Sequence, residues 1–111
     1  MMENSSFVPA RLNSLICRLA ELSYVDKIIL FGSRARGDAQ PRSDIDLAVS
    51  APGATAQQWM QLLDLVQEAP TLLAIDLIRY EEAGEELKMK IRQEGKVLYD
   101  RSESETESRE S

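Results

Sequence analysis

The segment at residues 44–50, Asp-Ile-Asp-Leu-Ala-Val-Ser, constrains the fold of this chain more than any other stretch. Polar and aliphatic residues alternate in it, and successive side chains of a β-strand point to opposite faces. The pattern therefore predicts a strand with one face against a hydrophobic core. The other face carries the carboxylates of Asp44 and Asp46, about 6–7 Å apart along the backbone. Two carboxylates at this spacing repel each other unless cations lie between them. The residues expected on the core side are Ile45, Leu47 and Val49.

Hydrophobic periodicity divides the rest of the chain into short helices and strands. Leucine and isoleucine recur at helical spacing after Pro9, and Thr55 and Gln58 have the spacing of a capping box. A short apolar run ends at Gly32, and the connection at 33–43 has room for one helical turn. We expect helices at about 9–22, 55–68 and 82–94, strands at about 27–31, 44–50 and 72–79, and a last short strand or packed extension at about 96–99.

This order of elements predicts a small α+β domain over residues 1–99. Its sheet should be mixed, with three or four strands, and its helices should pack mainly on one face. Residues 100–111 contain only Asp, Arg, Ser, Glu and Thr, which is the composition of a disordered acidic tail.

Composition excludes several classes of function. The net charge of −6 argues against a protein that binds DNA through its phosphate backbone. The chain has no histidine, which excludes His-based triads and His zinc sites, and its one cysteine, Cys17, has no partner for an internal disulfide. We expect Cys17 to pack within its helix. No apolar run approaches the ~20 residues of a membrane span, and no secretory signal opens the chain. We therefore expect a soluble cytoplasmic protein that contacts neither DNA nor membrane.

A third acid, Asp76, interrupts the apolar run Leu72–Ile78. Both faces of that run are apolar, which is typical of a central, buried strand, and a charged group there is costly unless it is paired or bound to metal. Beside the 44–50 strand, Asp76 can complete a metal site and deprotonate an incoming hydroxyl. Three carboxylates suit two magnesium ions, which take oxygen ligands and assist in-line phosphoryl displacement.

Gly32 and Ser33 mark the place where the first strand ends in a sharp turn. A glycine allows close approach of the backbone to a ligand, and the hydroxyl and amide of Ser33 can donate to phosphate oxygens. Arginines in the following loop can neutralise a triphosphate. Separately, each signal has an ordinary explanation, since Gly-Ser is a common turn and Asp-x-Asp is usually a solvated face. In this order and at this spacing they are far more restrictive.

Three segments together resemble the signature of the nucleotidyltransferase superfamily that includes DNA polymerase beta. They are Leu30–Gly37 (LFGSRARG), Ser43–Leu47 (SDIDL) and Ile75–Leu77 (IDL). The chain is most similar to the minimal nucleotidyltransferases (MNT), which often serve as antitoxins of HEPN toxins, and the ending Glu94–Tyr99 also resembles this branch. The resemblance covers about residues 9–99.

The resemblance implies a site and a reaction. Asp44, Asp46 and Asp76 would bind two Mg2+ ions, with Asp76 also acting as the base. The triphosphate of ATP would be held by Gly32, Ser33, Arg36, Arg42 and Ser43. AMP would pass from ATP to a hydroxyl, in MNT–HEPN systems a tyrosine of the toxin, whose ribonuclease activity is silenced. The partner would then be a HEPN toxin encoded nearby, in a hetero-oligomer with this chain.

Two alternatives stay open from the sequence. The same fold can neutralise a partner by contact alone, without nucleotide chemistry. It can also act as the catalytic subunit for a small molecule that a separate substrate-binding protein presents, because this chain is too short to hold a second domain of its own.

Overall fold

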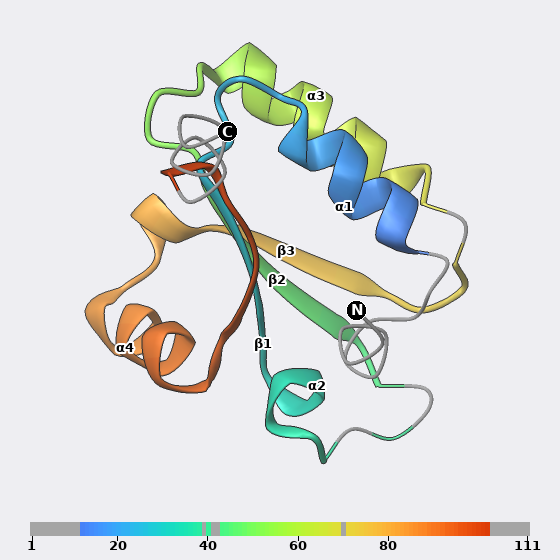
Figure 1. Ribbon diagram of the computed structural model, residues 1–111, viewed down its shortest axis with the longest axis vertical. Coiled ribbons are helices and arrows are strands. Elements are labelled where there is room, and N and C mark those ends of the chain that lie inside the picture. Colours follow the sequence, from blue (N-terminus) through green and yellow to red (C-terminus); the bar gives the residue numbers. More distant parts are fainter. Residues whose placement is uncertain (1–11, 39, 41–42, 70, 103–111) are drawn as a thin grey trace, which may run out of the picture.

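A four-stranded mixed sheet organises the protein, with the strand order β3-β2-β1-β4 (Figure 1). The computed structural model describes residues 12–38, 40, 43–69 and 71–102. The strands are β1 (Lys27–Phe31), β2 (Ile45–Ser50), β3 (Ile75–Arg79) and β4 (Lys96–Asp100). β1 pairs antiparallel with both β2 and β4, whereas β2 and β3 are parallel. The α+β class and the mixed sheet predicted from the sequence are confirmed.

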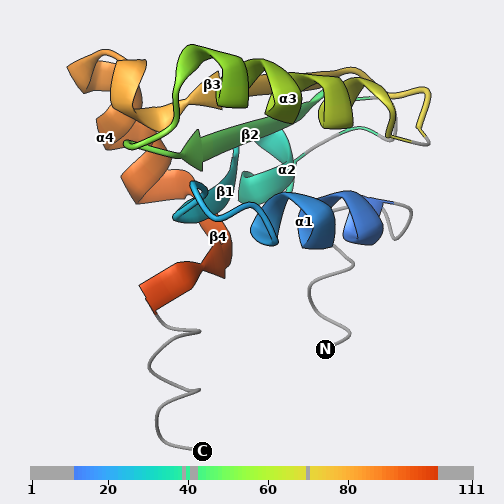
Figure 2. The same ribbon diagram turned by 90° about the horizontal axis from the view of Figure 1, so that it is seen from above.

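The helices lie on both faces of this sheet. They are α1 (Asn13–Ala20), α2 (Ser33–Arg36), α3 (Ala56–Gln67) and α4 (Glu85–Glu94), with a 3-10 turn, η3, at Tyr80–Glu82. Figure 1 shows α1 and α3 side by side over one face and α4 against the other, and Figure 2 gives the same arrangement from above. The preference of the helices for one face therefore holds for α1 and α3, while α4 covers part of the second face.

The larger core lies between the sheet and the helices α1 and α3. The three residues expected on the core side of the 44–50 strand, Ile45, Leu47 and Val49, are fully buried there. α1 contributes Leu15 and Leu19 to the same cluster. Since burying one such side chain stabilises a fold by about 1.5–3 kcal/mol, this layer supplies most of the hydrophobic stabilisation.

A smaller apolar cluster lies on the second face, around Ile29, Ala48 and Ile91. Ile91 and the partly buried Leu87 form the apolar stripe by which α4 packs on the sheet. Ala48 shares this face of β2 with Asp46, because side chains two residues apart point the same way. The packing of α4 therefore places one of its sides close to the predicted site.

Local signals explain where several elements begin and end. The capping box of α3 is formed as predicted: Gln58 N donates to Thr55 Oγ1 over 3.1 Å, and Thr55 N donates to Gln58 Oε1 over 2.9 Å. The last helix begins at Glu85 instead of residue 82, because the 3-10 turn takes up residues 80–82. The third strand is shorter than predicted and begins at Ile75.

The sequence also led to expectations for the last strand, for Cys17, for the tail and for membrane spans. Residues 96–100 do form a strand, paired with β1. Cys17 is exposed, so the expectation that it packs in its helix was wrong; it lies on the side of α1 away from Leu15 and Leu19. The predicted tail falls largely outside the described residues. In the described part of the chain, no helix has the length and apolar character needed to cross a membrane.

Gly95 joins α4 to β4 at a close contact between these elements and β1. Its φ of −71° is open to any residue, so space is the constraint here. A Cβ at this position would overlap the carbonyl oxygen of Ile91 and the Cγ2 of Ile29. We expect Gly95→Ala to lower the free energy of unfolding by about 1–3 kcal/mol, measured by urea denaturation. Gly53→Ala is the matched control, because a Cβ there meets nothing within 4 Å. Equal effects of the two substitutions would contradict this explanation.

Candidate active site

The turn after β1 brings the backbone against a carboxylate of β2. Gly32 has φ 79° and ψ −157°, a conformation open essentially only to glycine, and α2 begins at the next residue, Ser33. Phe31 pairs with Asp46 in the β1–β2 register, so Gly32 lies next to Asp46. A Cβ on Gly32 would overlap Asp46 Oδ2. The sharp turn predicted at Gly32 is therefore present, and it makes room for the Asp46 carboxylate.

The three acids of the predicted site lie on neighbouring positions of the sheet. Asp44 directly precedes β2, and Asp46 is the Cα partner of Asp76 in the parallel β2–β3 pair. The pKa of Asp46 is raised, first by burial, then by the negative charges of Asp76 and Asp44, while Arg36 lowers it. The charges of the three carboxylates are therefore close enough to act on one another, and Asp46 lies between the other two.

Asp76 differs from the expectation in its surroundings. The sequence predicted a central, buried strand, but β3 is the edge strand of the sheet and Asp76 is exposed. Both faces of β3 are apolar because both hydrophobic clusters reach this edge of the sheet. Leu77 packs on the larger core and Ile78 on the smaller one. The carboxylate of Asp76 is consequently open to molecules that approach from beyond the sheet.

Arg34, at the start of the connecting segment, is already engaged by a protein group. The Nε and Nη2 of Arg34 donate to the carbonyl oxygen of Ser43 over 3.2 and 3.0 Å, which closes the loop between α2 and β2. The Oγ of Ser43 accepts from the backbone N of Gln40 over 2.8 Å. Arg42 lies outside the described residues. Ser43 therefore holds the loop together through its carbonyl oxygen and its hydroxyl.

Arg36 connects α2 to the end of α4. Its Nε lies 3.2 Å from Asp38 Oδ2 and its Nη1 lies 3.2 Å from Glu94 Oε1. Hydrogen bonds to Asp38 and then to Glu94 raise the pKa of Arg36. The contact with Glu94 was not predicted from the sequence, because it joins residues 58 positions apart. The Arg36–Glu94 pair thus connects α2 to α4, and the charge of Arg36 also acts on Asp46.

The chain matches the model of the family described as polymerase beta, nucleotidyltransferase, over residues 13–104. It belongs to this nucleotidyltransferase family. The resemblance seen in the sequence to the polymerase beta superfamily is thereby confirmed.

Solved structures of this fold include several toxin–antitoxin complexes. A toxin–antitoxin crystallised with AMP-PNP is 27% identical, with a TM-score of 0.63, over 78% of this chain and 72% of that chain. A structure assigned as a minimal nucleotidyltransferase is 29% identical, with a TM-score of 0.51, over 78% of this chain and 84% of that chain. The tri-AMPylated Shewanella oneidensis HEPN toxin in complex with MNT antitoxin shares the fold at 23% identity, with a TM-score of 0.56, over 84% of this chain and 73% of that chain. No curated protein matches the sequence.

The three acids of the predicted site can be compared with the ligands that magnesium takes. Carboxylate oxygens are the ligands that Mg2+ prefers, and two-metal sites take much of their coordination from substrate phosphates and water. Within the described residues, no three acids, cysteines or histidines converge on a single ion-binding position. The three acids thus supply carboxylate oxygens for a cation, and the remaining ligands would have to come from substrate and water.

Gly32→Ala tests the close approach to Asp46. The substitution forces a strained backbone and displaces the carboxylate, so we expect it to cost about 1–3 kcal/mol of stability and to weaken Mg2+-dependent ATP binding strongly. Gly37→Ala separates the two causes, since Gly37 also has positive φ (89°) but a Cβ there meets nothing within 4 Å. Gly37→Ala should lose stability and keep ATP binding, as measured by urea denaturation and calorimetry. Intact binding in Gly32→Ala would contradict the steric argument.

Asp46→Asn tests the electrostatic cost of the site. Because the fold raises the pKa of Asp46, its ionised form opposes folding at neutral pH, and this cost disappears as the pH falls through the raised pKa. We expect Asp46→Asn to raise the Tm at pH 7 without magnesium by about 2–4 °C and to lose this advantage at lower pH. Asp64→Asn, an exposed acid on α3, should have a smaller effect. A Tm for Asp46→Asn at or below that of the wild type at pH 7 would refute the assignment.

Proposed function

We propose that this protein is an ATP-dependent adenylyltransferase that transfers AMP to a hydroxyl of a partner protein and thereby neutralises it. The observation that carries the proposal is the placement of Asp44, Asp46 and Asp76 on adjoining strand positions beside the Gly32–Ser33 turn, in a chain of the nucleotidyltransferase family. Nucleotidyl transfer requires that arrangement: anionic ligands for magnesium next to a turn that accommodates phosphates.

The residues divide the reaction between them. Gly32 and Ser33 would hold the triphosphate, and Asp44 and Asp46, with Asp76, would hold the magnesium ions. Magnesium held there would supply positive charge to the phosphates and to the leaving pyrophosphate. Asp76, exposed at the sheet edge, orients the incoming hydroxyl and accepts its proton. The acceptor oxygen forms a bond to the α-phosphorus as the bond from that phosphorus to pyrophosphate breaks.

The partner that we propose is a HEPN toxin, modified on a tyrosine. A toxin–antitoxin similar to this chain was crystallised with AMP-PNP, which supports nucleotide use in this branch of the fold. An AMPylated HEPN toxin was found in complex with an MNT antitoxin of the same fold, which supports a protein acceptor. The exposed edge position of Asp76 is compatible with an acceptor as large as a protein.

Substitution of the acids separates catalysis from neutralisation by contact. We expect the double variant Asp44→Asn, Asp46→Asn to lower transfer of label from α-labelled ATP to a HEPN-type partner encoded nearby by about a thousandfold or more, because the charges that hold magnesium are lost. The complex with the partner should persist in size-exclusion chromatography. Asp64→Asn, far from the site on α3, should transfer label at the wild-type rate.

The same experiment tests the alternatives. If the double variant still neutralises the partner in cells, contact alone is responsible and the catalytic proposal fails. If the wild type labels a small molecule presented by another protein and leaves the HEPN-type partner unlabelled, the acceptor is wrong. Asp76→Asn refines the result: it should slow transfer more than it weakens ATP binding, since Asp76 acts on the acceptor hydroxyl.

A further inference from the structure

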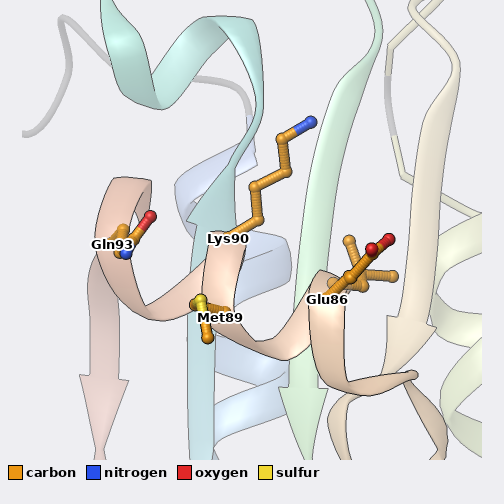
Figure 3. A pocket seen from close by; sticks show the side chains of 5 residues that line it. Glu86, Met89, Lys90 and Gln93 are labelled. Carbon is orange, nitrogen blue, oxygen red and sulfur yellow. The ribbon is translucent and has the colours of Figure 1, made fainter.

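A pocket of about 440 Å³ lies along one side of α4, lined by Glu86, Leu87, Met89, Lys90 and Gln93. Figure 3 shows that Lys90 extends from the helix toward the end of the sheet where α2 lies, whereas Met89 points away from that end. No step of the reaction described above uses these residues.

The packing of α4 fixes the position of Lys90. Its neighbour Ile91 is buried against Ile29 and Ala48 on the second face of the sheet. Asp46 lies on that same face of β2, two residues from Ala48, or about 6–7 Å along the strand. A lysine that starts beside Ile91 can span such a distance with its four-carbon stem.

The helical spacing leads to the same placement. Residues four apart lie on one side of a helix, so Lys90 is one turn before Glu94 and on the same side. Glu94 Oε1 lies 3.2 Å from Arg36 Nη1 of α2. Lys90 therefore lies on the side of α4 that carries the contact with α2.

The charges around the predicted site favour an additional cation, and the amine of Lys90 can supply it. A bound triphosphate brings several negative charges to three carboxylates that already repel one another. The arginines of α2 are occupied: Arg34 holds the carbonyl of Ser43, and Arg36 is paired with Asp38 and Glu94. For Lys90, by contrast, no ion pair or hydrogen bond is found within residues 12–102 apart from the undescribed positions 39, 41–42 and 70. Its amine can therefore meet an incoming phosphate without breaking an existing bond.

We propose that Lys90 binds the β- and γ-phosphates of the nucleoside triphosphate and stabilises the pyrophosphate as it leaves. This assignment rests on the proposed nucleotidyl transfer and adds a nucleotide-binding residue from outside the strand and turn motifs. A lysine ammonium is a compact charge with three donors, which suits the diffuse charge of a diphosphate group.

The test compares binding of two nucleotides that differ only in these phosphates. We expect Lys90→Gln to weaken binding of the AMP-PNP–magnesium complex by about tenfold, since hydrogen bonds to charged groups contribute on this scale. Binding of AMP, which lacks the β- and γ-phosphates, should be unchanged. Lys90→Arg should restore most of the affinity. Isothermal calorimetry at fixed ionic strength measures all of these values.

Lys88→Gln is the matched control, because the Lys88 amine lies 5.5 Å from the ring centre of Tyr80 and so points elsewhere on the same helix. It should bind AMP-PNP as the wild type does. Equal affinity of Lys90→Gln and the wild type for AMP-PNP would overturn the assignment. So would an equal loss of AMP and AMP-PNP binding, or an equal loss in Lys88→Gln, because these indicate a general disturbance of α4.

The outcomes also separate this inference from the proposed function. If AMP-PNP binds and depends on Lys90 but no label reaches a partner, the transfer proposal fails and the role of Lys90 stands. If label is transferred and Lys90→Gln binds AMP-PNP normally, only the role of Lys90 fails. A wild-type protein that binds no nucleotide would overturn both.

Discussion

The burial of Asp46 against Gly32, beside two other acids, is the constraint on which the predicted site depends. Its carboxylate is set between those of Asp44 and Asp76 and against the backbone of Gly32, and burial and both neighbours raise its pKa. The antiparallel register of β1 with β2 brings Gly32 to it, and the parallel pairing of β2 with β3 brings Asp76. A shift of one residue in either register would move a carboxylate to the opposite face and dissolve the cluster.

The opposite face of the sheet compensates for this cost. Between the sheet and α1 and α3, the aliphatic residues of β2 are fully buried, so the same strand that concentrates negative charge also anchors the main core. The two functions are separated by the alternation of side chains along one strand. The smaller cluster, on the face that α4 covers, consists of Ile29, Ala48 and Ile91 with a few partly buried residues packed against them. The main hydrophobic core thus lies on one face of the sheet, and the carboxylates of the predicted site lie on the other.

Much of this fold could be predicted from local sequence patterns, whereas the rest depends on contacts between residues far apart in the sequence. Alternation in residues 44–50, the capping box at Thr55 and the glycine after β1 are short-range features, and each was predicted from the sequence. The edge position of β3 could not be predicted, because a strand with apolar residues on both faces has the same pattern at the edge of a sandwiched sheet as at its centre. The contact between Arg36 and Glu94 joins residues 58 positions apart and has no local signature. The orientation of Lys90 depends in the same way on how α4 packs, and its sequence pattern alone is that of a solvated helix face.

The end of β4 has a practical consequence for experiments on this molecule. Arg101 donates to the carbonyl oxygens of Leu22 and Val25, and its backbone N donates to Asp26 O, so the strand is fastened to the loop before β1. Lys27 pairs with Asp100 at one end of the sheet, while Phe31 and Asp46 lie at the other, about 13 Å away along the strand. A fluorophore or surface tether attached at Ser102 would therefore lie at the end of the sheet opposite the three acids.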